Sequence, residues 1–171
     1  MLPSVKMSSV PITSLDFRRA LGQFATGVTV VTVQREARAV HGMTANSFTS
    51  VSLDPPLVSV CVDQRAHLLP LLLEKRFFGV NILREEQQRL SEFFSRPDQS
   101  EREEQRMHVD FQWTPDGIPL LGAVLCQMAC RLHAAHPAGD HTIVVAEVLS
   151  ASLHGGLPLL FFQGRYTRLH P

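Results

Sequence analysis

Short runs of β-branched and apolar residues, separated by turns, constrain the fold of this chain most. Such runs are typical of strands, because branched side chains pack well on a pleated sheet. They lie at 28–33, 57–62, 77–83, 123–136, 141–153 and 159–162. Helical periodicity is confined to 17–24, 66–75 and 84–94. The pattern predicts a mainly β domain, in which an antiparallel, closed or nearly closed sheet carries a few helical covers.

A hydroxyl-rich stretch at 42–56, GMTANSFTSVSLDPP, is unlike a core strand. If it is extended, alternation places Asn46, Phe48 and Ser50 on one side and Ser47 and Thr49 on the other. Both sides then offer neutral donors and acceptors. This suits a flat ligand with a polar edge, such as a flavin ring. It also suits a solvated edge strand, which the composition by itself favours.

The length and composition of the chain are those of one ordinary globular domain. The chain has 171 residues, 44% of them apolar, with 16 basic and 16 acidic residues. This balance argues against nucleic acid or an anionic membrane as partner. Residues 1–13 lack the apolar middle of a signal peptide and are expected to form a disordered lead-in to a domain at 14–171. The three cysteines indicate a reduced, cytoplasmic setting.

The segment 123–136 is open to two interpretations. As a helix, it would bring Cys126, Cys130 and His133 to one face, where they could hold zinc. As a strand, its apolar residues alternate cleanly and His133 faces away from the cysteines. We therefore expect a strand and no metal site. The chain also lacks a Gly-x-Ser-x-Gly elbow and the glycine-rich phosphate loops.

Two single residues are candidates for ligand contacts. Asn81, inside 77–83, either satisfies neighbouring backbone or contacts a ligand. His141 follows a Gly139-Asp140 turn at the lip of a strand, where neutral imidazole can stack on a ring or donate a hydrogen bond. A plain surface histidine explains the same spacing, and spacing by itself favours that reading.

Five blocks occur in a fixed order: FRRALGQFATGVTVVT, GMTANSFTSVSLDPPLVSVCV, FFGVNIL, AGDHTIVVAEV and PLLFFQGRY. From about Phe17 to Leu169, the chain resembles the flavin reductases that supply reduced flavin to two-component monooxygenases. The resemblance implies a homodimeric split β-barrel of the FMN-binding type with a Greek-key core. It implies hydride transfer from NADH or NADPH to FMN or FAD. It also implies a flavin-dependent monooxygenase that receives the reduced flavin.

The resemblance also implies roles for particular residues. His141 would lie against the nicotinamide as the catalytic residue, and Phe161, Phe162 and Gly164 would help to form that pocket. The flavin-binding residues would be Thr44, Ala45, Asn46, Ser47, Phe48, Thr49, Ser50, Ser52, Leu53, Cys61, His67 and Asn81.

Two departures from the family pattern bear on these roles. Where relatives have a Ser-x-Thr or Ser-x-Ser pattern that holds the flavin phosphate, this chain has Ala66-His67-Leu68. His67, Arg65 or the start of the following helix can donate to a phosphate instead. Otherwise flavin binds weakly, as a substrate. Phe162 stands where relatives often have Tyr. The lost hydroxyls leave one alternative, a non-catalytic flavin- or haem-binding protein on the same barrel.

Overall fold

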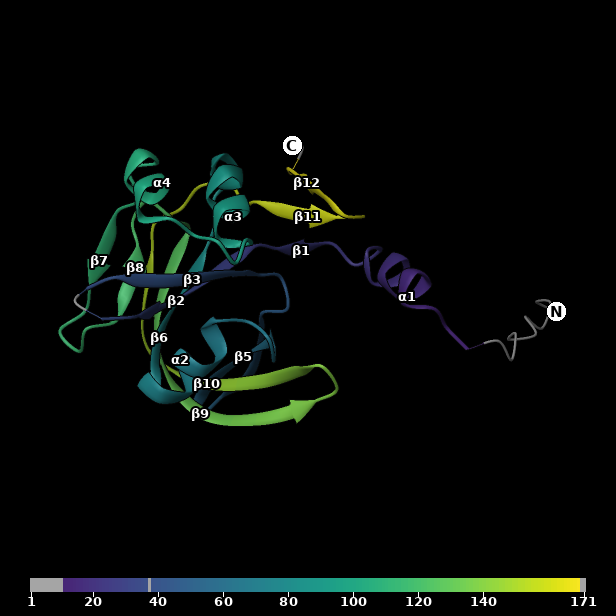
Figure 1. Cartoon of the computed structure of the whole chain (residues 1–171), viewed down its shortest axis with the longest axis horizontal. Coiled ribbons are helices and arrows are strands. Elements are labelled where there is room, and N and C mark those ends of the chain that lie inside the picture. Colours follow the sequence, from purple (N-terminus) through teal and green to yellow (C-terminus); the bar gives the residue numbers. More distant parts are fainter. Residues whose placement is uncertain (1–10, 37, 170–171) are drawn as a thin grey trace.

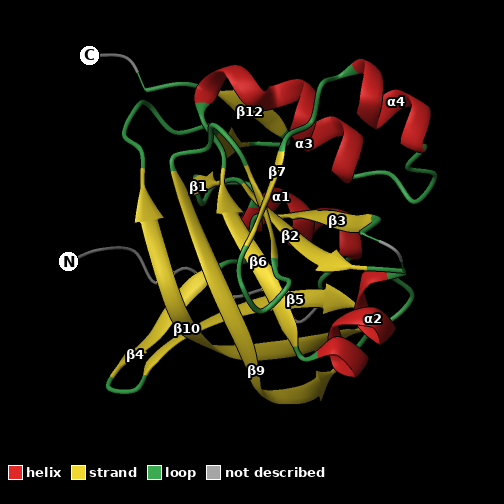
Figure 2. Ribbon diagram, turned by 90° about the vertical axis from the view of Figure 1, so that its left-hand side faces the viewer, coloured by secondary structure: helices red, strands yellow, loops and turns green. Residues whose placement is uncertain are grey.

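A seven-stranded antiparallel sheet forms the body of the molecule (Figures 1 and 2). The computed structural model describes residues 11–36 and 38–169, without the side chains at 101, 102 and 106. The strand order is β3-β2-β6-β9-β10-β5-β4. In chain order these strands are β2 Thr29–Gln34, β3 Val40–Ala45, β4 Thr49–Leu53, β5 Pro56–Asp63, β6 Phe77–Ile82, β9 Cys126–Ala138 and β10 His141–Leu153.

Smaller elements surround this sheet. A three-stranded sheet has the order β1-β11-β12, and β7 and β8 form a hairpin. Their bounds are β1 Thr26–Gly27, β7 Phe111–Trp113, β8 Pro119–Leu121, β11 Leu160–Phe162 and β12 Arg165–Thr167. The helices are α1 Ser14–Leu21, α2 Leu68–Lys75, the 3₁₀ turn η1 Glu85–Gln87, α3 Gln88–Phe94 and α4 Glu101–Arg106. None of the helices in the described ranges is both long and apolar enough to cross a membrane.

The mainly β, antiparallel architecture expected from the sequence is confirmed. The ambiguous segment 123–136 is a strand, because β9 pairs with both β6 and β10. Downstream of α4, β7 and β8 form a short hairpin, in which Phe111–Trp113 pair with Pro119–Leu121. Residues 1–10 of the expected lead-in lie outside the described residues, and the first helix begins at Ser14, capped by the Thr13 hydroxyl.

The core shows why the sheet curls. One apolar cluster joins Val31 of β2 to Val60 of β5, although these strands lie near opposite ends of the strand order. Leu68 and Leu72 of α2 pack into the same cluster. A second cluster holds the α3 face beside β11 and β12. In Figure 2, α2 lies near one end of the curled sheet and α3 near the other.

The hydroxyl-rich stretch is not one extended strand, which corrects the alternation expected for 42–56. It forms β3 as far as Ala45, breaks at 46–48, and resumes as β4 at Thr49. The strands β3 and β4 are the two edges of the sheet. The break at 46–48 therefore links one edge to the other over three residues and holds the two edges close together.

The helix α1 is not a cover on the sheet, contrary to the role expected for 17–24. It has no buried residue, and Phe17 and Leu21 are 51% and 57% exposed. Figure 1 shows α1 standing apart from the sheet, beyond β1. Its apolar stripe is real, but within the described residues of a single chain no part of it is buried.

Candidate functional site

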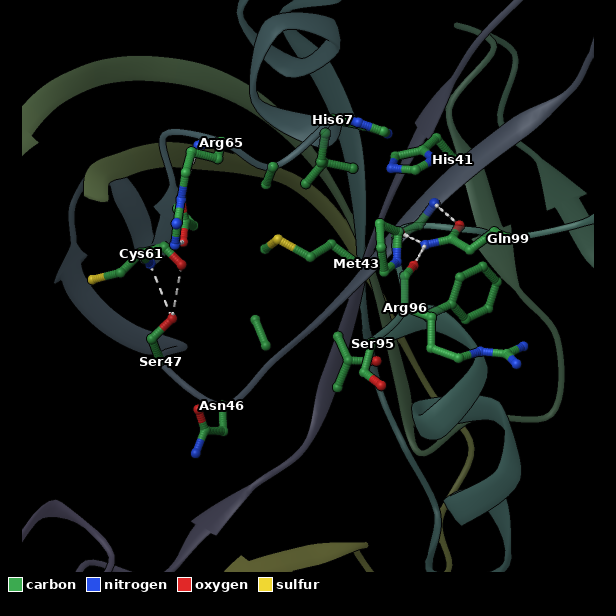
Figure 3. A pocket seen from close by; sticks show the side chains of 18 of the residues that line it. His41, Met43, Asn46, Ser47, Cys61, Arg65, His67, Ser95, Arg96 and Gln99 are labelled. Atoms are coloured by element: carbon green, nitrogen blue, oxygen red, sulfur yellow. Dashed lines mark hydrogen bonds and ion pairs between the residues drawn. The ribbon is translucent and has the colours of Figure 1, made fainter. Parts of the chain in front are cut away.

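A cavity of about 620 Å³ opens between β3 and β5, next to the start of α2 and the end of α3 (Figure 3). We call it the β3–β5 cavity. Its volume lies within the range of about 300–1,000 Å³ that is usual for small-molecule sites. Of the catalytic and flavin-binding residues that the resemblance implies, those that line it are Thr44, Ala45, Asn46, Ser47, Cys61, His67 and His141.

The Ser47 hydroxyl fixes one side of this cavity. Its oxygen accepts a hydrogen bond from the Cys61 backbone N–H at 3.0 Å and donates to the Cys61 carbonyl at 3.2 Å. Both bonds tie the 46–48 link to β5. Asn46, which directly precedes Ser47 in the link, is exposed and keeps its amide available at the cavity wall. The wall formed by Asn46 and Ser47 is therefore uncharged and held in place by backbone bonds.

The β3 wall of the cavity is held in place through Gly42 and through Gln99, which follows α3. A Cβ at Gly42 would lie 2.3 Å from Phe94 Cδ1, so only glycine lets α3 pack this close to β3. The Gln99 amide donates to the Gly42 carbonyl at 2.7 Å and accepts from the Gly42 N–H at 3.3 Å. The Thr44 hydroxyl donates to the Ser91 carbonyl at 2.7 Å. These bonds hold β3, α3 and the segment at Gln99 together around the cavity.

Sequence reasoning missed His41, Arg96 and Gln99, all of which line this cavity. Gln99 meets Gly42 across 57 residues of chain. It lies in a loop with no motif to mark it. His41 directly precedes the hydroxyl-rich stretch, and this adjacency is a signal that could have marked it.

Basic side chains gather at the α2 end of the cavity. His67 is the residue that precedes α2, is exposed, and makes no capping bond with its side chain. Its ring centroid lies 6.2 Å from that of His41. Burial lowers the pKa of His41, and the nearby charges of Arg35 and His67 lower it further. His41 is therefore neutral at pH 7, and its ring can accept or donate one hydrogen bond.

Arg65 is held in place by the turn that follows β5. Its backbone N–H and side-chain Nε donate to Asp63 Oδ1 at 2.8 and 3.1 Å, and its Nη2 donates to Asp63 Oδ2 at 2.9 Å. These bonds hold the pKa of the Asp63 carboxyl well below its usual range. The turn thus presents a fixed guanidinium at the rim of the cavity. Figure 3 shows Ser47, Cys61 and Arg65 on one side, with His41, His67 and Gln99 on the other.

His141 reaches the same cavity from the start of β10, where it pairs with Asp63 of β5. Its Nδ1 lies 2.7 Å from Asp140 Oδ1. In the neutral ring this contact assigns the proton to Nδ1, because the carboxylate can only accept. The hydrogen bond to His141 lowers the pKa of Asp140. Asp140 therefore orients the imidazole and leaves Nε2 for another partner.

The β4 residues do not line the cavity in this single chain. They are Thr49, Ser50, Ser52 and Leu53, on an edge strand whose pairing with β5 shifts register between Ser50 and Ser52. Leu53 is 94% exposed. Phe48 packs instead against the main core cluster. The break at 46–48 separates these residues from those that precede it.

Asn81 belongs to the core, and the expectation that it binds flavin is corrected. Its Nδ2 donates to the Val30 carbonyl at 2.9 Å and to Thr32 Oγ1 at 3.1 Å, and its Oδ1 accepts from the Leu121 N–H at 2.8 Å. It is fully buried. The amide joins β2, β6 and β8 and does not reach the β3–β5 cavity.

Phe161, Phe162 and Gly164 lie at the β11–β12 turn, outside the β3–β5 cavity. Phe161 packs edge-on against Tyr166, with ring centroids 5.4 Å apart. Gly164 lines a different cavity, of about 360 Å³, together with residues of α1 and the turn after it. One chain therefore does not bring these three residues to His141.

The donors around the β3–β5 cavity fit a planar heterocycle that carries a phosphate. The Ser47 side offers neutral backbone and amide groups, and the α2 end offers imidazole and guanidinium donors. Within the described part of the chain, no group of three or more His, Cys, Asp or Glu residues is placed to hold a metal ion. The arrangement offers groups that can bind and orient such a ligand, and the imidazole of His141 lines the same cavity.

Comparison with known proteins shows that this chain is similar to flavin reductases in both sequence and structure. The family described as "Flavin reductase like domain" matches residues 21–170. An FMN reductase (NADH) from Agrobacterium fabrum is 41% identical over 91% of this chain and 86% of its own. The reductase component of 4-hydroxyphenylacetate 3-monooxygenase from Thermus thermophilus is 43% identical over 90% of this chain and 95% of its own. The solved structure of an NADH:FAD oxidoreductase from Streptomyces globisporus superimposes with a TM-score of 0.85, at 36% identity, covering 99% of this chain and 100% of that one.

Proposed function

The chain belongs to the flavin reductase-like domain family, and from this premise we propose that it is an NAD(P)H:flavin oxidoreductase. It reduces FMN or FAD and supplies the reduced flavin to a flavin-dependent monooxygenase. The observation that carries this is a single cavity that joins the uncharged wall at 44–47, the basic end at Arg65 and His67, and the imidazole of His141. The two NADH-dependent relatives and the monooxygenase reductase support the same reaction.

Flavin and nicotinamide, when bound, supply the hydride chemistry between them. The chain's own residues need only bind and orient the two rings at stacking distance. The 46–48 link, tied to β5 by Ser47, holds backbone groups and the Asn46 amide at the flavin rim. His67 and Arg65 replace the hydroxyls missing at Ala66 and Leu68 as partners of the phosphate.

His141 marks the nicotinamide side of the cavity. Asp140 holds its Nδ1, so the ring keeps one orientation and its Nε2 can contact a nicotinamide. Both residues are accessible at the rim, where a nicotinamide can enter after the flavin. His141 positions the hydride donor and does not need to exchange a proton with it.

The finer architecture that we propose is a homodimeric split β-barrel with a Greek-key core, formed by residues 14–171 as one domain. Two features support it. The edge strands β3 and β4 are linked by three residues, which favours closure of the sheet. The exposed apolar residues of α1 and Leu53 of β4 are surfaces that a second copy can cover. The partner copy would complete the pocket near β4 and the β11–β12 turn.

We also infer a reducing, cytoplasmic setting. All three cysteines are free thiols. Burial raises the pKa of Cys130 to about 12, with a smaller effect from Cys126, so this thiol stays protonated and unreactive. Neither nucleic acid nor membrane is needed as a partner.

The test is an assay of NADH and NADPH oxidation with FMN, FAD and riboflavin in every combination. We expect consumption of NADH or NADPH only when flavin is present. His141→Ala should slow oxidation while flavin affinity stays within a few fold, and the matched control His133→Ala, an exposed histidine on β9, should change neither. If the protein binds flavin but consumes neither nucleotide, the reductase proposal fails and the non-catalytic flavin-binding alternative takes its place.

A further inference from the structure

A second cavity adjoins the β3–β5 cavity, and the proposed reaction does not use it. It has a volume of about 250 Å³ and lies between the turn joining β2 to β3 and helix α4. We call it the arginine cavity. Arg35 and Arg38 line it from the turn, and Glu104 and Gln105 line it from α4. Since the relatives include both an FMN reductase and an FAD oxidoreductase, family membership does not decide which flavin this chain prefers.

We propose that the arginine cavity binds the adenylate half of FAD, so that FAD is the preferred flavin of this enzyme. The inference rests on the proposed function, because it assumes that the β3–β5 cavity holds the flavin ring and its first phosphate. It adds a second binding site and names Arg35 and Arg38 as specificity-determining residues.

The two cavities share a wall. His41 and Gln99 line both of them. Gln99 is held in place by its two hydrogen bonds to Gly42, and its amide also donates to the Arg96 carbonyl at 2.9 Å. A ligand whose phosphate lies at the basic end, beside His67, is therefore close to His41 and to the boundary of the arginine cavity. A longer ligand can continue across that boundary, whereas FMN ends there.

The charge of the arginine cavity suits a second phosphate. Arg35 and Arg38 are exposed, and neither forms an ion pair with a side chain that the structure describes. Arg35 is close enough for its charge to help lower the pKa of His41. Guanidinium groups bind phosphate oxygens through two parallel hydrogen bonds. Both guanidinium groups come from the β2–β3 turn, so the phosphate belongs on that side of the cavity.

The turn itself is suited to hold these two groups. The Arg35 N–H donates to the Ala39 carbonyl at 2.7 Å, and the Ala39 N–H donates to the Glu36 carbonyl at 2.9 Å, which closes the turn. The Arg38 guanidinium lies over the Trp113 ring, 5.9 Å from its centroid. A guanidinium held in this way can stack on an adenine ring, and the Gln105 amide on the facing helix can hydrogen-bond to an adenine edge.

The test compares the dissociation constants of FMN and FAD, measured by quenching of flavin fluorescence in the absence of NADH. We expect the wild type to bind FAD more tightly than FMN. In the variant Arg35→Gln/Arg38→Gln, the affinity for FAD should fall by about tenfold or more, the scale of one hydrogen bond to a charged group, while that for FMN changes by less than about twofold. The charge-preserving Arg35→Lys/Arg38→Lys variant should keep part of the FAD preference.

Arg89→Gln is the matched control, because Arg89 is an exposed arginine on α3 that lines neither cavity. It should leave both dissociation constants unchanged. Salt gives a second measurement, since the FAD constant should rise more steeply with ionic strength than the FMN constant in the wild type, and the difference should vanish in the double Gln variant.

Three results would overturn the inference. Equal weakening of FMN and FAD would assign the two arginines to the phosphate that both flavins share. Unchanged affinities for both would show that the arginine cavity takes no part of the flavin. Either result leaves the reductase proposal intact. Failure of the wild type to bind any flavin would instead remove the proposed function and this inference with it.

Discussion

Ser47 makes both of its hydrogen bonds with the backbone of one residue, Cys61, and this decides its role. A hydroxyl that already donates to a carbonyl and accepts from an N–H has little capacity left for a ligand. Its contribution to flavin binding is therefore indirect. It holds the 46–48 link, and with it Asn46, against β5.

We predict that Ser47→Ala lowers the free energy of unfolding by about 1–3 kcal/mol, because the Cys61 N–H and carbonyl lose their partner. Flavin affinity should fall as well, as the link loosens. Denaturant unfolding and flavin titration measure the two effects. Ser50→Ala, on the exposed edge strand β4, is the control and should change the free energy of unfolding by less than about 0.5 kcal/mol. Weaker flavin binding with unchanged stability would show instead that Ser47 contacts the flavin.

At the residue scale, the sequence marks the polar side chains but not how each is used. The 44–47 segment, Cys61, His67 and His141 were all found from the chain and lie around one cavity. Asn81 has the same polar chemistry yet lies in the core, because the Val30 carbonyl and the Leu121 N–H need its amide. Such partners are distant in the sequence, so a single sequence cannot separate a structural amide from a binding one.

At the scale of elements, β8 packs so closely over β6 that one position must be glycine. A Cβ at Gly79 would lie 2.4 Å from the Pro119 carbonyl oxygen and 2.5 Å from Thr32 Oγ1. The first of these is backbone and cannot rotate away. The Thr32 hydroxyl also donates to the same Pro119 carbonyl at 2.6 Å, which fixes the spacing between the elements.

We expect Gly79→Ala to destabilise the protein by about 1–3 kcal/mol, as overpacking of a core does. Gly27→Ala is the matched comparison, because a Cβ at Gly27 meets nothing within 4 Å in one chain. The midpoint of denaturant unfolding for each variant measures the difference. Similar midpoints for the two variants would show that β8 can shift at little cost.

The ion pair in the turn after β5 should make the stability of the protein depend on pH in the acid range. The hydrogen bonds from Arg65 depress the pKa of Asp63 below its value in the unfolded chain. A depressed carboxyl pKa contributes stability above the unfolded value, about pH 4, and that contribution is lost as the pH falls further. The stability advantage of wild type over Asp63→Asn should therefore be constant from about pH 5 to pH 8 and shrink below about pH 4. Urea unfolding at each pH gives the difference, and an advantage that grows towards low pH would refute the linkage.

The sequence predicted whether a segment is a helix or a strand better than it predicted where that element begins and ends. Regular alternation at 123–136 and β-branched runs such as 28–33 indicated strands that the structure confirms. Alternation could not locate the break at 46–48, because the hydroxyl residues continue through it without a proline or glycine. The break is made by tertiary contacts, chiefly the bond between Ser47 and β5.

At the scale of the whole molecule, the strand order and the place of α1 lay beyond the sequence. Short links favour antiparallel neighbours, yet β6 pairs with β9 across 43 residues of intervening chain that hold three helical elements and a hairpin. Periodicity revealed the apolar stripe of α1 but not what the stripe faces. A stripe exposed in one chain is explained if another copy of the chain covers it.

A second copy of the chain can cover the exposed apolar stripe of α1. We expect the purified protein to have twice the 19.1 kDa mass of one chain in light scattering. Phe17→Glu places a charge in the middle of the α1 stripe, where burial of the phenyl ring would contribute about 1.5–3 kcal/mol. The dissociation constant of the dimer should rise by about tenfold or more. Leu73→Glu, the same kind of change at an exposed leucine on α2, should leave the mass unchanged. A monomeric wild type, or a Phe17→Glu variant that stays dimeric, would mean that α1 is not the dimer contact, and its exposed stripe would then have to face a different protein.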